Sequence, residues 1–350
     1  MSWLEDFDDD QDDGPDENDI RVRPNPKANR PRTKRRPAHA DAVIARVLGV
    51  DRGRYAVLVD EDGPQERRIT ATRARELRKQ AIVTGDRARV VGDISGAEGT
   101  LARIVGIEER TSLLRRSADD TDQVERIIVA NADQMLIVVA AADPEPRPRL
   151  VDRYLVAALD AGVRPLLVVT KTDLADPSSF LAHFEGLDLE VFTSAPDHVP
   201  LERIGAALVG HSTVFVGHSG VGKSTLVNAL TGSERAIGHV NVVTGRGRHT
   251  SSSTVSFRYR GPGGAGWVID TPGVRSFGLG HVDPANILGA FTDLAEIAKE
   301  CPRGCTHLPD APDCAIAEAV AEGRLGPGGA ARLDSLQRLL MTFTTHRVEG

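Results

Sequence analysis

Residues 217–225 read Gly217-His218-Ser219-Gly220-Val221-Gly222-Lys223-Ser224-Thr225. They follow the apolar run 213–216 and open a helical pattern over 223–230, so the segment joins a strand to a helix. It matches the phosphate-loop motif G-x-x-x-x-G-K-[ST] in full. Glycines in such a loop let backbone N–H groups surround phosphates, and the helix N-terminus adds positive potential. Lys223 is predicted to contact the β- and γ-phosphates, and Ser224 to ligate Mg²⁺.

A guanine-reading element is predicted where the apolar run 165–169 ends, at Thr170-Lys171-Thr172-Asp173. The Asp173 carboxylate can accept hydrogen bonds from guanine N1–H and the 2-amino group together, whereas adenine presents no such pair of donors. After the next strand, Thr193-Ser194-Ala195 is predicted to complete the base pocket, with the Ala195 N–H meeting guanine O6. Neither short motif is specific alone, but together with the phosphate loop they indicate GTP.

Two further elements are predicted to sense the phosphates. Asp270-Thr271-Pro272-Gly273 follows the strand 267–269 and matches Asp-x-x-Gly. Asp270 would hold Mg²⁺ through water, and the Gly273 N–H would sense the γ-phosphate. The segment 245–254 is rich in glycine and hydroxyl groups, as expected of a mobile switch that supplies one Mg²⁺ ligand. A plain flexible loop is the alternative for that segment.

The order of these elements is permuted. A typical GTPase has its phosphate loop first and its base-reading motifs last, whereas here residues 170–173 and 193–195 precede residue 217. The same sheet can form from this order of motifs if the chain enters the fold at a different strand. Continuous apolar strands alternating with helical patterns indicate a parallel sheet covered on both faces. The predicted fold is therefore an α/β permuted phosphate-loop GTPase domain.

The residue after the Asp-x-x-Gly element is Val274, where many GTPases place a glutamine that orients water. Valine has no hydrogen-bonding group, so intrinsic hydrolysis is expected to be slow. Another residue or a partner must then supply the missing group. His249, in the predicted switch segment, is the candidate within the chain, although a lone histidine in a loop is more often simply solvated.

A metal centre is predicted near the C-terminus. All three cysteines lie between positions 301 and 314, and with one histidine they form the set Cys301, Cys305, His307 and Cys314. Three thiolates and one imidazole suit one tetrahedral structural Zn²⁺ and leave no open coordination position for catalysis. The alternative is three free cysteines and an unrelated histidine. The surrounding pattern turns helical from about residue 290.

The N-terminal part divides into a charged tail and a small β domain. Residues 1–20 carry ten Asp or Glu, and residues 21–36 carry eight Lys or Arg. Such blocks predict a disordered tail over 1–40, either for solubility or as a basic arm for RNA phosphates. Residues 41–112 hold about five short β runs separated by turn signals, which suit an OB-type barrel but also other small β folds.

Two compositional features bear on location. No stretch approaches the roughly 18–20 apolar residues of a membrane helix, and the acidic start shows no signal-peptide pattern. The sequence therefore predicts a cytoplasmic protein with no membrane partner, despite a net charge of −7 that by itself argues against nucleic acid.

The permuted order, the four nucleotide motifs and the cysteine cluster together resemble the small-ribosomal-subunit biogenesis GTPase family RsgA, also called YjeQ, over about residues 41–343. The resemblance implies an OB-fold RNA-binding domain over 41–112, a permuted GTPase domain over 113–290, and a helical zinc domain over 291–350. It also implies GTP hydrolysis that the small subunit and its rRNA stimulate late in maturation, with His249 as the catalytic histidine. A monomer is expected.

Three positions depart from the family pattern. Thr170 stands where Asn is common, which is expected to weaken the base pocket slightly. The run after His249 is Thr-Ser-Ser instead of threonines, so the Mg²⁺ ligand is Thr250 or Ser251. The cysteine cluster has three and six intervening residues where four and five are usual, which leaves the shape of its first loop open.

Two functional hypotheses of different classes follow from these residues. One is a ribosome-stimulated GTPase, and the other is an RNA-binding module that uses GTP only as a conformational switch. A phosphate-loop ATPase or small-molecule kinase is a third reading, which Asp173 and the switch segment oppose.

Overall fold

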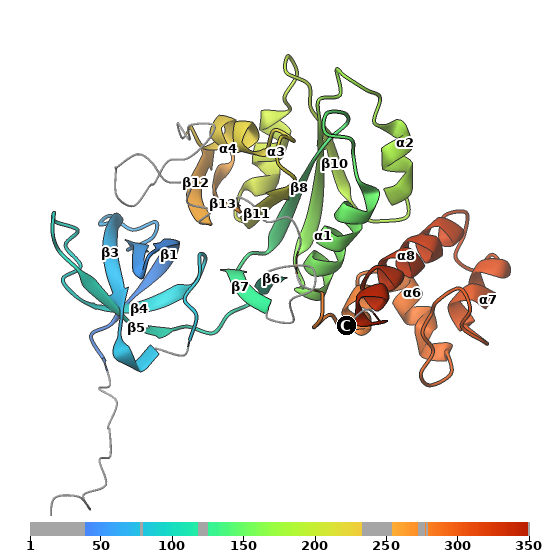
Figure 1. The fold of residues 1–350 in the computed structure, drawn as a ribbon, viewed down its shortest axis with the longest axis horizontal. Helices are drawn as coiled ribbons and strands as arrows, with labels where there is room; N and C mark the ends of the chain where they lie inside the picture. Colours follow the sequence, from blue (N-terminus) through green and yellow to red (C-terminus); the bar gives the residue numbers. More distant parts are fainter. Residues whose placement is uncertain are drawn as a thin grey trace, which may run out of the picture. The chain divides into compact units, whose positions relative to one another are not determined.

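A closed five-stranded barrel forms the N-terminal part of the computed structural model, which describes residues 39–77, 80–117, 125–232, 254–271, 277 and 279–348 (Figure 1). Its strands are β1 (Val43–Asp51), β2 (Arg54–Val59), β3 (Arg67–Arg73), β4 (Arg87–Gly92) and β5 (Ala102–Ile107), with a 3-10 turn η2 (Arg75–Leu77) after β3. β1 pairs with both β2 and β4, and β5 joins β4 to β3. Alternating small and β-branched residues fill the interior, as a narrow barrel requires. The predicted OB-type barrel is confirmed.

A short hairpin of β6 (Leu113–Ser117) and β7 (Glu125–Ala130) follows the barrel. Asn131 connects this hairpin to the barrel, because its side-chain amide donates to the Gly85 carbonyl at 3.0 Å and its oxygen accepts from the Thr111 N–H at 2.9 Å. A Cβ at Gly85 would lie 2.0 Å from the Ala130 carbonyl oxygen, so only glycine permits this close approach.

The central sheet is mainly parallel, with strand order β10-β9-β8-β11-β13-β12. Its strands are β8 (Gln134–Ala140), β9 (Arg164–Thr170), β10 (Glu190–Thr193), β11 (Ser212–Gly217), β12 (Val255–Gly261) and β13 (Gly264–Asp270). β12 alone runs antiparallel, as the hairpin partner of β13. Its helices are α1 (Pro148–Asp160), α2 (Ser178–Leu181) with η3 (Ala182–Phe184), α3 (Leu201–Leu208) and α4 (Lys223–Thr231).

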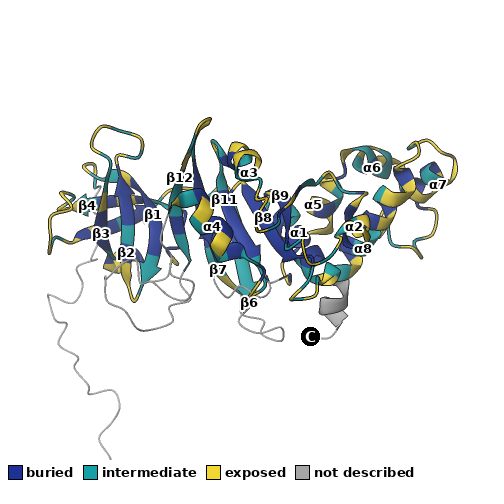
Figure 2. Cartoon of the chain, turned by 90° about the horizontal axis from the view of Figure 1, so that it is seen from above, coloured by how far each residue is buried: buried dark blue, intermediate teal, exposed yellow. Residues whose placement is uncertain are grey.

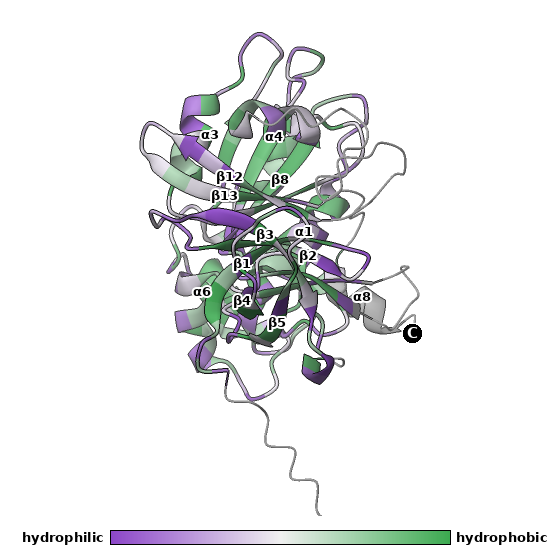
Figure 3. Cartoon of the chain, turned by 90° about the vertical axis from the view of Figure 1, so that its left-hand side faces the viewer, coloured by the Kyte–Doolittle hydropathy of each residue, from purple (hydrophilic) through white to green (hydrophobic). Residues whose placement is uncertain are grey.

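Helices cover both faces of this sheet, which explains its continuous apolar strands. All seven residues of β8 are buried, and the strand is dark blue in Figure 2 and green in Figure 3. One face packs against α1 and the C-terminal helices, and the other packs against α3 and α4. The predicted doubly covered α/β sheet is confirmed.

The permutation is visible in the strand order. The chain builds β8, β9 and β10 outward in one direction and then returns to place β11 on the other side of β8. Strand order reverses between β8 and β11, and ligands of open α/β sheets bind beyond the carboxyl ends of strands at such a point. The phosphate loop begins at the carboxyl end of β11, at this position.

The C-terminal region is helical and shares a core with α1. It contains α5 (Pro284–Gly289), α6 (Thr292–Ile297), the turn η4 (Ala298–Glu300), α7 (Ala315–Ala321) and α8 (Gly329–Val348). Leu336 and Leu339 of α8 are fully buried within the cluster that contains α1. Arg338 of α8 pairs with Asp152 of α1 and donates to the His183 carbonyl at 2.6 Å. None of the helices in the described ranges combines the length and apolar composition needed to cross a bilayer.

Candidate nucleotide site and metal centre

The phosphate loop has the backbone that its glycines predict. β11 ends at Gly217 and α4 begins at Lys223. Gly220 and Gly222 have φ angles of 84° and 87°, a conformation that favours glycine. A Cβ at Gly217 would lie 2.4 Å from the Val138 carbonyl oxygen, so this glycine permits close packing of the loop against β8. The motif therefore specifies a loop that other residues could not form without strain.

Lys223 and Asp270 meet at the centre of the site. The Lys223 ammonium pairs with the Asp270 carboxylate, and the two residues are only 8% and 1% exposed. The Thr271 hydroxyl donates to the Phe215 carbonyl at 2.7 Å, which holds the end of β13 against β11. The phosphate-binding lysine and the Mg²⁺-holding carboxylate predicted from separate motifs are thus adjacent in space.

The two predicted base-reading motifs also lie together. The Thr172 N–H and hydroxyl each lie 3.2 Å from the Ser194 carbonyl oxygen. The Lys171 ammonium contacts the Asp143 carbonyl, beyond the end of β8. These residues follow the carboxyl ends of β9 and β10, and parallel strands place those ends at one edge of the sheet.

Thr170 has a role that the sequence did not indicate. Its hydroxyl lies 2.7 Å from the Val221 carbonyl oxygen and 3.2 Å from that of Val139. A single hydroxyl donates to one of them at a time, and either bond joins the end of β9 to the phosphate loop or to β8. The residue that departs from the family pattern therefore supports the loop backbone.

The Ala195 N–H is occupied by an internal contact. It donates to the His198 carbonyl at 3.1 Å, and the His198 N–H returns a bond of 3.0 Å to Ala195. The predicted contact with guanine O6 therefore requires this turn to open.

Asp173 is exposed, and within the described ranges its carboxylate has no hydrogen-bond partner, so it is free to accept from a base.

Several predicted site residues lie outside the described residues. These are His249, Thr250 and Gly273, together with Ser251 and Val274. Beyond the Asp-x-x-Gly element, Phe277 is fully buried and packs edge-on against Tyr154 of α1, with ring centroids 5.7 Å apart. Motif reasoning did not predict the contacts of Thr271 and Asp143. Thr271 fills a variable position of the Asp-x-x-Gly element, and Asp143 contributes only its backbone carbonyl.

The cysteine cluster is assembled as predicted. The ligand atoms of Cys301, Cys305, His307 and Cys314 all lie within 4.8 Å of one another. His307 Nδ1 lies 3.7 Å from Sγ of both Cys301 and Cys314. A tetrahedral ion with Zn–S and Zn–N distances near 2.3 and 2.0 Å separates such ligands by about 3.6 Å. Gly304, between the first two cysteines, has a φ of 81°, a turn conformation that favours glycine.

The protonation states at this cluster depend on a cation. Burial, together with smaller contributions from the neighbouring Cys314 and Cys301, raises the pKa of the Cys305 thiol to about 11. Burial also lowers the pKa of His307, which favours the neutral imidazole that binds metals. A bound divalent cation stabilises the thiolate form of cysteine, so this set of three thiols and one neutral imidazole fits a metal ion.

Comparison with known proteins agrees with this geometry. A family model described as RsgA GTPase matches residues 107–280. The small ribosomal subunit biogenesis GTPase RsgA of Pseudomonas aeruginosa is 39% identical over 260 residues, covering 71% of this chain and 72% of the relative. The protein of the same name from Azotobacter vinelandii is 40% identical over 256 residues, 71% of each chain.

Two solved structures share the fold at 23% identity. YjeQ from Thermotoga maritima has a TM-score of 0.60, covering 87% of this chain and 99% of its own. YloQ, described as a circularly permuted GTPase, has a TM-score of 0.61 over 90% and 99%. The phosphate loop at the strand-order reversal, the permuted motifs and these similarities show that this chain belongs to the RsgA GTPase family.

Proposed function

We propose that this chain hydrolyses GTP to GDP and phosphate while bound to the small ribosomal subunit, and assists the late maturation of that subunit. The observation that carries the GTPase assignment is the meeting of Lys223 and Asp270 beside the base-reading motifs at one edge of the sheet. The named relatives support the link to the small subunit. Measuring GTP turnover with and without purified small subunits tests both parts.

Nucleotide binding would exchange the partners at the centre of the site. Lys223 would move from Asp270 to the phosphate oxygens, and Asp270 would then face a Mg²⁺ ion that Ser224 and Thr250 help to ligate. Both groups are buried, so the ion pair keeps each charge compensated before the nucleotide arrives. Backbone N–H groups of residues 217–225 would surround the phosphates, and Mg²⁺ would neutralise the charge that develops during transfer.

Guanine specificity should depend on Asp173. We expect Asp173→Asn to weaken GTP binding by roughly tenfold to a hundredfold, because hydrogen bonds to a charged group contribute about 1.5–3 kcal/mol. Binding of xanthosine triphosphate should improve, since its C2 carbonyl accepts from an amide. Fluorescent-nucleotide titration measures both affinities. Asp176→Asn is the matched control, because Asp176, three residues after Asp173, is an exposed carboxylate that accepts hydrogen bonds from Ser178. Equal binding of ATP and GTP by the unchanged protein would contradict the assignment.

RNA contact is proposed for the barrel and for the basic part of the tail. The described part of the barrel exposes seven arginines that could meet phosphates: Arg52, Arg54, Arg68, Arg73, Arg75, Arg89 and Arg103. Binding to the small subunit should weaken with salt, with a log–log slope of about −0.7 to −0.9 per neutralised phosphate.

Deletion of residues 21–36 should make this salt slope shallower, because each lost phosphate contact removes one released counterion. Filter-binding or sedimentation assays at several salt concentrations measure it. Deletion of residues 1–20, which carry only acidic charge, is the control and should leave the slope the same or make it steeper. If both deletions leave the slope unchanged, the tail serves solubility alone.

Further parts of the proposal concern organisation and cofactors. One structural Zn²⁺ per chain is assigned to the cluster of residues 301–314, and Mg²⁺ accompanies GTP. We propose functional domains over 41–112, 113–290 and 291–350, with 1–40 as a tail. The protein would act as a monomer, and in the cytoplasm, where the proposed partner is available.

A further inference from the structure

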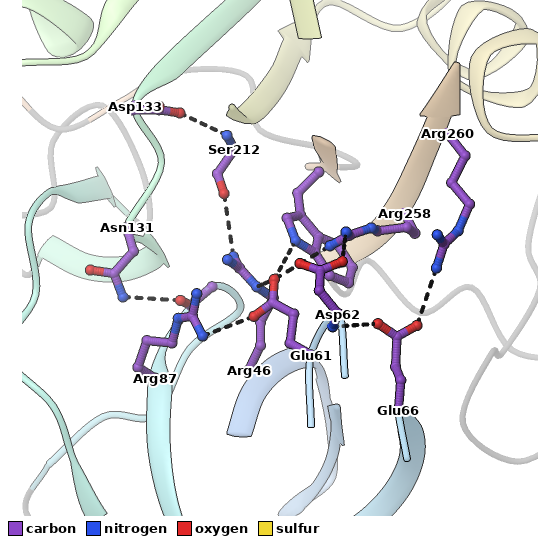
Figure 4. Close-up of polar contacts among 12 residues, drawn as sticks. Arg46, Glu61, Asp62, Glu66, Arg87, Asn131, Asp133, Ser212, Arg258 and Arg260 are labelled. Atoms are coloured by element: carbon purple, nitrogen blue, oxygen red, sulfur yellow. Dashed lines mark hydrogen bonds and ion pairs between the residues drawn. The ribbon is translucent and has the colours of Figure 1, made fainter. Parts of the chain in front are cut away.

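Glu61, in the loop after β2, lies at the centre of a charged cluster where the barrel meets β12 and β13 (Figure 4). Its Oε1 lies 3.0 Å from Nε of Arg46 and 3.4 Å from Nη1 of Arg258, and its Oε2 lies 2.8 Å from Nη1 of Arg87. The Glu61 side chain is 11% exposed, and those of Arg46 and Arg258 are 8% and 14% exposed. A single carboxylate therefore faces three guanidinium groups, two of them from the barrel and one from β12.

Trp267 of β13 belongs to the same cluster. Its indole N–H donates to Glu61 Oε1 at 2.7 Å, and the residue is 4% exposed. The guanidinium carbons of Arg46 and Arg258 lie 4.8 and 4.9 Å from its ring centroid. Cation–π contacts of this kind strengthen when they are desolvated. Burial lowers the pKa of Arg46 while Glu61 raises it, so the Glu61 charge compensates the buried Arg46 cation.

The cluster is connected to the nucleotide site by one row of paired strands. Gly49 of β1 pairs with Val255 of β12, Val255 with Asp270 of β13, and Asp270 with Phe215 of β11. The row runs from a barrel strand to the strand that leads into the phosphate loop. The Thr84 hydroxyl of the barrel also donates to the Thr254 carbonyl at 2.9 Å, directly before β12. Trp267 lies three residues before Asp270 on the same strand.

We propose that Glu61 is a positioning residue for GTP hydrolysis, which acts through Trp267 and Arg258 to hold Asp270 where Mg²⁺ requires it. The inference rests on the proposed GTPase function and adds to it a route of communication. Anything that binds the barrel and shifts the Glu61 loop changes the position of the Mg²⁺ carboxylate. Conversely, binding of Mg²⁺ and nucleotide at Asp270 changes the surroundings of Trp267.

The first test compares the Mg²⁺ requirement of two variants. Glu61→Gln keeps the size of the side chain but leaves Arg46 and Arg87 without their carboxylate, and leaves Arg258 with Asp62 alone. It should raise the Mg²⁺ concentration for half-maximal GTP turnover by about tenfold, within the range by which residues remote from a ligand alter coupling. Glu66→Gln is the matched control, because Glu66 also joins the barrel to β12, by a 3.3 Å pair with Arg260, but does not contact Trp267. An equal Mg²⁺ requirement in the two variants would overturn the inference.

The second test uses the fluorescence of Trp267. The chain has two tryptophans, Trp3 and Trp267, so Trp3→Phe leaves Trp267 as the sole emitter. Addition of Mg²⁺ and GDP to this variant should change its emission, and Glu61→Gln in the same background should remove most of the change. GDP without Mg²⁺ is the internal control. If the Trp267 emission of the Trp3→Phe variant does not change when Mg²⁺ and GDP are added, communication along β13 is contradicted.

A third variant covers the case in which Glu61→Gln fails to fold, as judged by circular dichroism. Trp267→Phe keeps the Glu61 carboxylate with its three arginine partners and keeps an aromatic ring at position 267, but it removes the indole donor. It should therefore raise the Mg²⁺ requirement in the same direction by about threefold. Combined with Glu61→Gln it should add little, because both act through one contact. If the unchanged protein hydrolyses no GTP, the proposed function fails. If it hydrolyses GTP but all variants match the control, only this inference fails.

Discussion

His249→Ala is expected to lower the subunit-stimulated rate of GTP turnover by about 10³, the low end of the effect seen when a GTPase loses a delivered catalytic group. The affinity for GTP should change little, because the role proposed for the imidazole is confined to the transition state. Val274 cannot orient water, so hydrolysis needs another group to do so. In the free protein the stimulation should be absent and turnover slow. Single-turnover assays with and without small subunits measure the rate directly.

Two further variants distinguish a catalytic role of His249 from general damage to the protein. His211→Ala removes a half-exposed imidazole that pairs with Asp133 at 2.8 Å, at the amino end of β11 and therefore at the opposite edge of the sheet from the phosphate loop. It should retain stimulated turnover. Lys223→Ala should instead impair binding and turnover together, because it removes both a phosphate ligand and the cation beside the buried Asp270. Full stimulated turnover in His249→Ala would assign the catalytic group to the ribosome or to another switch residue.

Loss of a metal ligand is expected to have the largest effect on folding. Cys314→Ser should abolish zinc binding and unfold the C-terminal helices, since structural zinc contributes about 10–16 kcal/mol of apparent binding energy in small zinc-dependent folds. Cys314 is 3% exposed and belongs to the core that α1 and α8 share, so the lesion also exposes apolar surface of α8. GTP binding should persist, because the phosphate loop and base-reading motifs lie at the ends of other elements.

Zinc content by elemental analysis and helix content by circular dichroism measure this effect. Asp310→Asn is a suitable control, because Asp310 is exposed in the same loop but is not part of the cluster. Freshly purified protein, prepared without chelator, should contain one zinc per chain. Protein that folds fully without any zinc would show that the three thiols and His307 are packed together for another reason.

Local patterns in the sequence were sufficient for most of the fold. The phosphate loop at 217–225, flanked by a strand and a helix, indicated the nucleotide fold, because only glycines tolerate its backbone. The apolar runs indicated a covered parallel sheet, and motif order indicated its permutation. The cluster at 301–314 indicated a metal site, because its ligands are close in sequence and their chemistry is specific. In each case the information is carried by neighbouring residues.

Only the tertiary structure decided which distant residues share a buried environment. Glu61 and Trp267 are 206 positions apart, and nothing in either segment indicates that one carboxylate of the barrel accepts from an indole of β13. The pairing of Asp152 with Arg338, which joins α1 to α8, spans 186 positions. The internal bond of the Ala195 N–H competes with the contact that its motif predicts, and no local pattern indicates it. Such contacts depend on how whole elements pack. Burial then makes each unpaired charge or donor costly, so the fold selects partners that local sequence patterns cannot identify.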